Sequence, residues 1–176
     1  MRPGGEGRRV RIMNQADLLG ISLLLFFAIL QSYRGKDGFG KTFLEMIGII
    51  IASAIAVAWY PGLARAVGLS ESSTLLILFF LVGFLFFLAA DLLATIADIS
   101  FESWDSLLSF FFGLGLGWAF CHILFRFLLL IYGKHSSFGL AVENSWVAKE
   151  ILDFRTFKAL VSLLYRAKLG PEIEEF

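Results

Sequence analysis

Four long apolar stretches, separated by short polar gaps, fill most of the chain. They lie near Leu18–Tyr33, Phe39–Trp59, Thr74–Ile99 and Leu107–Tyr132. An α-helix rises about 1.5 Å per residue, so a helix of about 20 residues crosses a hydrocarbon core of about 30 Å. Each stretch is close to that length. We therefore predict an all-α integral membrane protein with four transmembrane helices.

The composition agrees with a membrane protein and disagrees with a soluble domain. The chain has 176 residues, of which 58% are hydrophobic and only 17% are charged. Its mean hydropathy is +0.79. A soluble domain of this size would show shorter apolar stripes that alternate with charged faces. The lipid bilayer is thus the expected partner, and nothing in the composition favours binding of a nucleic acid.

The polar gaps divide the chain into three regions. We predict a disordered, basic tail over residues 1–15, a four-helix transmembrane domain over 16–133, and a C-terminal amphipathic helix with a tail over 134–176. Within the second region, the Gly-rich segment Ser32–Lys41 predicts a tight turn between the first two helices. Pro61 and Gly62 predict the end of the second helix.

After the fourth stretch, Gly133–Asn144 reads as a polar break and Ser145–Lys168 as one more helix. One face of that helix is apolar, and basic residues lie on another. Such a helix suits the membrane surface, where its basic residues would lie near anionic lipid. It could equally pack against the underside of the bundle, and the pattern does not separate the two placements.

The distribution of Lys and Arg predicts the topology. With both termini in the cytoplasm, eleven of these residues face the cytoplasm and three face the other side. The first apolar stretch follows a basic segment, but no cleavage site with small residues comes after it. We therefore interpret it as a membrane helix and not as a signal peptide.

Ionisable residues inside the spans are costly in lipid, so each needs an explanation. Glu45, Asp91, His122 and Arg126 lie within the predicted spans, and Asp17, Asp98 and Asp105 lie at their ends. Glu45 and Asp91 lie about 10 Å from the outer side, whereas Arg126 lies about 28 Å from it. This separation rules out pairing of Asp91 with Arg126.

Depth therefore predicts two groups of charges. An outer cluster would contain Arg34, Lys41, Glu45 and Asp91, and an inner pair would join Asp17 to Arg126. The outer cluster could act as a proton or ion relay, or it could only fix the register of the helices. His122 is more typical of a hydrogen-bonding residue than of a metal ligand, because no second histidine lies within a span. Cys121 reads as a small buried apolar residue. We predict no metal site, no cofactor and no catalytic residue.

Small residues recur at one-turn spacing in two of the spans. Gly113, Gly115 and Gly117 lie in the fourth stretch, and Gly48, Ala52 and Ala56 lie in the second. Such patterns let helix backbones approach closely. They predict packing inside the bundle or, alternatively, association with a second copy or with another membrane protein through these Gly and Ala faces.

Two short motifs flank the spans. Asp17 starts the first span, Arg34-Gly35 follows it, and Gly38-Phe39 with Lys41 opens the second. Asp105 precedes the fourth span, and Gly113 and Gly117 follow within it. Over Asp17–Leu169 this arrangement resembles the colicin V production protein (CvpA) family of small bacterial inner-membrane proteins. The chain departs from the family pattern at four positions: Thr42 replaces an acidic residue, Ser109 a glycine, and Ser106 and Leu116 basic residues.

The resemblance implies a location in the bacterial inner membrane. It also implies a role in the production or export of a toxin peptide and in envelope homeostasis, without an established enzymatic activity. We therefore expect an accessory or scaffold protein. The alternative is a small proton- or ion-coupled transporter or channel that uses Asp91, Glu45 and Arg34. An intramembrane enzyme is the least favoured class, because no HExxH or GxSxG motif is present.

Overall fold

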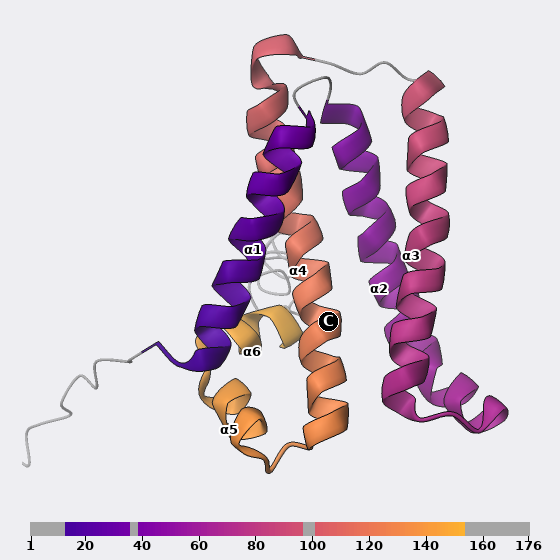
Figure 1. The fold of residues 1–176 in the computed structure, drawn as a ribbon, viewed down its shortest axis with the longest axis vertical. Helices are drawn as coiled ribbons and strands as arrows, with labels where there is room; N and C mark the ends of the chain where they lie inside the picture. The colour runs from indigo at the N-terminus through magenta and orange to yellow at the C-terminus, as the bar shows by residue number, and fades with distance from the viewer. Residues whose placement is uncertain (1–12, 36–38, 97–100, 154–176) are drawn as a thin grey trace, which may run out of the picture.

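The computed structural model describes residues 13–35, 39–96 and 101–153. Every regular element in these ranges is a helix, which confirms the all-α prediction (Figure 1). Four of the described helices are long and apolar enough to cross a membrane. They are α1 (Gln15–Arg34), α2 (Phe39–Val67), α3 (Glu71–Ile96) and α4 (Asp105–Tyr132).

The four long helices run alternately up and down. The end of α1, the start of α2, the end of α3 and the start of α4 lie together at one end of the bundle, here called the Arg34 end (Figure 1, top). The opposite end is called the Asp17 end. α1 packs against α4, α4 against α2, and α2 against α3. α3 is therefore held mainly through α2.

The second helix continues past the proline that we predicted would end it. α2 passes through Pro61 and stops at Val67. Proline has no N–H, so the carbonyl oxygen of Val57 loses its usual helical donor, and membrane helices tolerate such a site. One turn further on, Arg65 Nε donates to the carbonyl oxygen of Pro61 at 3.0 Å. The helix ends at Gly68, whose φ of 73° is the left-handed conformation that favours glycine at a C-terminus.

The predicted polar break after α4 contains a helix. α4 ends at Gly133, which has a φ of 79°, and α5 (Ser137–Asn144) follows at once. Ser136 caps α5, because its hydroxyl accepts a hydrogen bond from the amide of Gly139 at 3.0 Å. A polar segment of this length can form a helix once a cap and a packing surface are supplied. The prediction missed this helix because it was based only on the polarity of the segment.

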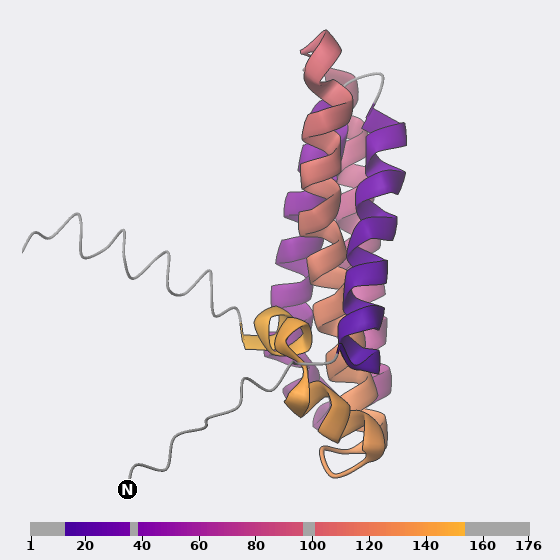
Figure 2. The same cartoon turned by 90° about the vertical axis from the view of Figure 1, so that its left-hand side faces the viewer.

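The last described helix is α6 (Trp146–Asp153). Together α5 and α6 lie against α1 and α4 at the Asp17 end (Figure 2). Ala148 and Ile151 of α6 are buried, so this part of the predicted C-terminal helix packs against the bundle. The amphipathic continuation beyond Asp153 and its interfacial placement lie outside the described residues, as do residues 1–12 of the predicted basic N-terminal tail. The last residue of that predicted tail, Gln15, already belongs to α1.

Small residues allow the long helices to approach closely. A Cβ atom added at Gly113 would lie 2.6 Å from the Cα atom of Ala28 on α1, and one added at Gly48 would lie 2.7 Å from Phe86 on α3. Gly117 faces α1 in the same way. The prediction of packing inside the bundle is thus confirmed for these glycines. Since they are buried within the chain, they do not form the outward Gly and Ala face that we considered for a partner.

The outer surface of the described bundle is apolar, as contact with lipid requires. Exposed Trp and Tyr side chains lie toward its two ends, where these residues favour the boundary between membrane and water. Those toward the Arg34 end are Tyr33 and Trp104, and those toward the Asp17 end are Trp59, Tyr132 and Trp146. The rise from Phe39 to Trp59 along α2 is about 30 Å, which matches a hydrocarbon core.

Candidate functional site

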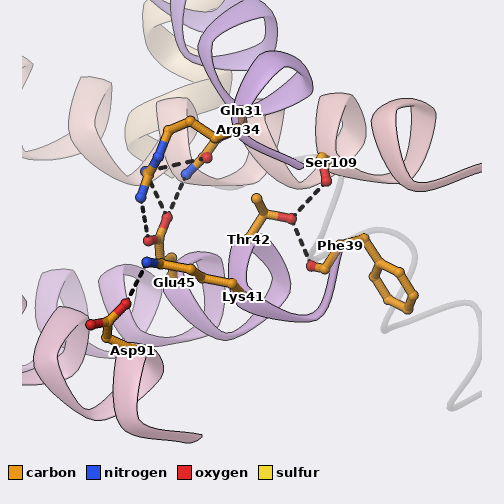
Figure 3. A network of polar contacts seen from close by, with 8 residues as sticks. All are labelled: Gln31, Arg34, Phe39, Lys41, Thr42, Glu45, Asp91 and Ser109. Carbon is orange, nitrogen blue, oxygen red and sulfur yellow. Dashed lines mark hydrogen bonds and ion pairs between the residues drawn. The ribbon is translucent and has the colours of Figure 1, made fainter. Parts of the chain in front are cut away.

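A buried carboxylate dominates the Arg34 end. The side chain of Glu45, near the start of α2, is only 1% exposed. Arg34, in the last turn of α1, donates to its two oxygens at 2.7 and 2.9 Å, and Gln31 donates to Oε2 at 2.8 Å (Figure 3). A buried charge is tolerated only when it is paired and hydrogen-bonded. The bidentate geometry meets both needs and joins α1 to α2.

A second ion pair joins α2 to α3. Lys41 lies one turn before Glu45 on α2, and its ammonium group donates to Asp91 Oδ1 (Figure 3). The Lys41 side chain is 43% exposed and that of Asp91 is 62% exposed. The structure thus brings the four predicted outer residues to one end of the bundle. Each carboxylate has its own cation, which offsets the repulsion between two carboxylates at a similar depth.

Hydroxyl groups add contacts that the sequence analysis missed. Thr42 Oγ1 donates to the carbonyl oxygen of Phe39 at 2.7 Å and lies 2.9 Å from Ser109 Oγ on α4 (Figure 3). Thr42 and Ser109 are two of the positions that depart from the CvpA pattern, and here they contact each other. Ser109 also packs against Gly35, where an added Cβ would lie 1.8 Å from its hydroxyl oxygen. The sequence marked Thr42 and Ser109 as departures from the family pattern, but only the fold shows that the two residues contact each other.

Asp17 organises the other end of the bundle. Its Oδ2 accepts from the amide of Asn14 at 3.1 Å, while Asn14 Oδ1 accepts from the amide of Asp17 at 2.9 Å, so the two form a capping box at the start of α1. Its Oδ1 accepts from the Ser145 hydroxyl at 2.5 Å and from the amide of Val147 at 3.1 Å. Asp17 therefore caps α1 and, from a distance in sequence, the first turn of α6.

Two side chains of α4, His122 and Arg126, form a chain of hydrogen bonds that holds the last described turn of α6. His122 Nδ1 lies 2.9 Å from the carbonyl oxygen of Ile151. Because a carbonyl oxygen only accepts, Nδ1 carries the proton and Nε2 is left as an acceptor. Arg126 Nε donates to this Nε2 at 2.9 Å. α6 is thus attached to α1 near its start and to α4 in its last described turn.

The inner pair of Asp17 with Arg126 that we predicted is wrong. The oxygens of Asp17 accept from Asn14, Ser145 and Val147, and Arg126 donates to His122. The physical reason is the position of α6, whose first turn presents N–H and O–H donors to the carboxylate. Depth along the chain placed Asp17 and Arg126 near the same end, but it could not predict that α6 lies beside Asp17.

The remaining family-motif residues act in turns and in packing. Asp105 is buried, and its Oδ1 accepts from the amide of Phe101 at 2.7 Å across the short helix η2 (Glu102–Trp104). The rings of Phe39 and Phe101 stack with centroids 5.1 Å apart. These contacts hold the entry into α4 against the start of α2. Gly38 and Asp98 lie outside the described residues.

Within the described ranges, no group of three or more His, Cys, Asp or Glu residues could hold a metal ion. Comparisons of the chain with protein-family models, with curated proteins and with solved structures find no match. The candidate site is therefore defined by geometry: two ion pairs at the Arg34 end, one with a buried carboxylate and one exposed, and a carboxylate and a histidine that hold α6 at the Asp17 end.

Proposed function

We propose that this chain is an accessory or scaffold protein of the bacterial inner membrane, of the colicin V production type. It supports the production or export of a colicin V-like toxin and envelope homeostasis. One observation carries the proposal: ionisable groups within the spans join helices to one another. Glu45 joins α1 to α2, Asp91 joins α2 to α3, Asp17 joins α1 to α6, and His122 joins α4 to α6.

Contacts of this kind favour a scaffold function over transport of an ion or proton. A transported ion or proton must exchange partners with the groups along its path. Glu45 instead receives three hydrogen bonds from α1. The outward side of α3 is apolar, with Phe80, Phe84 and Leu88 exposed. A rigid frame with an apolar outer helix suits a protein that acts by supporting other membrane components.

Deletion of the gene in its host tests this proposal. We expect less toxin peptide in the medium and greater uptake of a dye that an intact envelope excludes. Wild-type protein and the control Arg65→Gln restore both readouts, whereas Glu45→Ala, which breaks the α1–α2 contact, restores neither at equal protein level. Normal toxin release and dye exclusion in the deletion strain would refute the proposal.

The second candidate function is a small proton- or ion-coupled transporter or channel that uses Asp91, Glu45 and Arg34. The observation that favours it is a carboxylate buried within a span and paired with Arg34, beside a second ion pair that is exposed. Purified protein in liposomes loaded with a pH-sensitive dye would then carry a pH-dependent flux. Asp91→Asn would abolish that flux and Arg65→Gln would not. A scaffold gives no flux in any of these variants.

The proposed orientation places both termini in the cytoplasm. Reporter fusions after Lys36, Ser70, Glu102 and Phe176 test it, because each reporter is active on only one side of the membrane. We expect residues 36 and 102 to report the outside and the other two the inside. The opposite pattern would move the Arg34 end to the cytoplasmic face and overturn the charge-based topology.

A further inference from the structure

The Lys41–Asp91 ion pair lies where lipid headgroups meet the bundle. Lys41 is about 3 Å from the start of α2, and Asp91 is about 8 Å from the end of α3. The exposed aromatic residues Tyr33 and Trp104 are at the same end, and such residues mark the headgroup region. The pair is therefore an exposed polar patch at the edge of an apolar surface, within reach of a phospholipid headgroup.

Both members of the pair keep unused bonding capacity. An ammonium group has three N–H donors, and one of those of Lys41 is directed at Asp91 Oδ1. Asp91 Oδ2 receives no hydrogen bond from any residue that the structure describes. Asp91 lies on α3 and Lys41 on α2, and both side chains are substantially exposed. Neighbouring lipid can thus contact a donor and an acceptor side by side.

Charge balance selects the headgroup. Arg34 neutralises Glu45 and Lys41 neutralises Asp91, so the patch has both signs and no net charge. An anionic headgroup would satisfy Lys41 but place its negative charge beside Asp91. A zwitterionic headgroup can satisfy both residues. A trimethylated ammonium cannot donate a hydrogen bond to Asp91, whereas a primary ammonium can.

We propose that Lys41 and Asp91 form a binding site for a phospholipid whose headgroup carries a phosphate and a primary ammonium. The phosphate contacts the Lys41 ammonium, and the lipid ammonium donates to Asp91 Oδ2. The two-carbon link of ethanolamine keeps its phosphate and ammonium adjacent, as the ion pair keeps Lys41 and Asp91 adjacent. This lipid-binding proposal does not rest on the scaffold function, although the Lys41–Asp91 pair also joins α2 to α3.

Native mass spectrometry of the full chain tests the proposal. Detergent-purified protein is mixed with equal amounts of phosphatidylethanolamine, phosphatidylcholine and phosphatidylglycerol that share the same acyl chains. We expect phosphatidylethanolamine to be retained about tenfold over the other two, the ratio expected for about one charge-assisted hydrogen bond. Equal retention of the three lipids, or a preference for phosphatidylglycerol, would overturn the proposal.

Matched variants assign the preference to this patch. Lys41→Gln and Asp91→Asn should each remove it, while Arg65→Gln and Glu71→Gln, at the opposite ends of the same two helices, should keep it. A preference that survives Asp91→Asn contradicts the site. A series of wild-type measurements needs no variant to fold: retention should fall as methyl groups replace the N–H donors of the lipid one by one. Retention that ignores this methylation also contradicts the site.

Discussion

Asp17 of α1 accepts a hydrogen bond from the amide of Val147 at 3.1 Å, although the two residues are 130 positions apart. The same carboxylate completes the capping box at the start of α1. One side chain therefore sets the start of the first helix and the position of the last described one. Asn14 adds to the contact, because its Nδ2 donates to the carbonyl oxygen of Ala141 at 2.7 Å.

Removing this carboxylate should loosen α6 and destabilise the bundle. Asp17→Ala deletes caps at two helix starts, and each cap contributes about 1 kcal/mol, so we expect a loss of about 2 kcal/mol in the free energy of unfolding. Unfolding in detergent, followed by circular dichroism, measures it. The control is Glu143→Ala, an exposed position on α5. If the two variants unfold alike, Asp17 does not anchor α6.

The tautomer of His122 predicts different effects for its two amide replacements. Asn can place a donor near Nδ1 and keep the bond to the carbonyl oxygen of Ile151, whereas Gln can place a group only near Nε2, where Arg126 binds. We therefore expect trypsin to cut at Lys149 of α6 several-fold faster in His122→Gln than in His122→Asn, since cleavage reports local opening. Equal rates, or the reverse order, would show that the Ile151 contact does not hold α6.

The Arg34–Glu45 pair should show strong coupling. Arg34→Gln leaves a buried carboxylate without its cation, and we expect a loss of about 3 kcal/mol in the free energy of unfolding. The double variant with Glu45→Gln removes the charge as well and should recover part of that loss. A double-mutant cycle from chemical unfolding gives the coupling energy. Additive effects of the two substitutions would mean that the pair contributes nothing of its own.

Gly113 should not tolerate a side chain. Gly113→Ala brings a Cβ within 2.6 Å of the α1 backbone, and overpacking of this kind costs about 2 kcal/mol. Gly62 on α2 provides the control, because nothing lies within 4 Å of a Cβ added there. Gly62→Ala should leave stability unchanged or raise it slightly through helix propensity. Thermal unfolding in detergent compares the two. A smaller loss at Gly113 than at Gly62 would disprove the close contact of α4 with α1.

The sequence predicted the four long helices because the membrane imposes a strong local rule. Any segment that crosses lipid must satisfy its backbone within a helix of about 20 apolar residues, and such a segment is visible in the sequence. The same rule allowed the depths of Arg34, Lys41, Glu45 and Asp91 to be estimated from the helical rise. The prediction that Pro61 ends the second helix failed, since α2 continues to Val67 and proline within a membrane helix does not have to end it.

By itself, then, the sequence determined the helical class, the spans and the end of the bundle at which each charge lies, because these depend on local hydrophobicity and on the fixed rise of a helix. Only the tertiary structure decided that Glu45 pairs with Arg34 and Lys41 with Asp91. It also decided that Asp17 binds α6 and not Arg126. Partner choice depends on which helix packs beside a buried group, and that contact joins residues far apart in the chain.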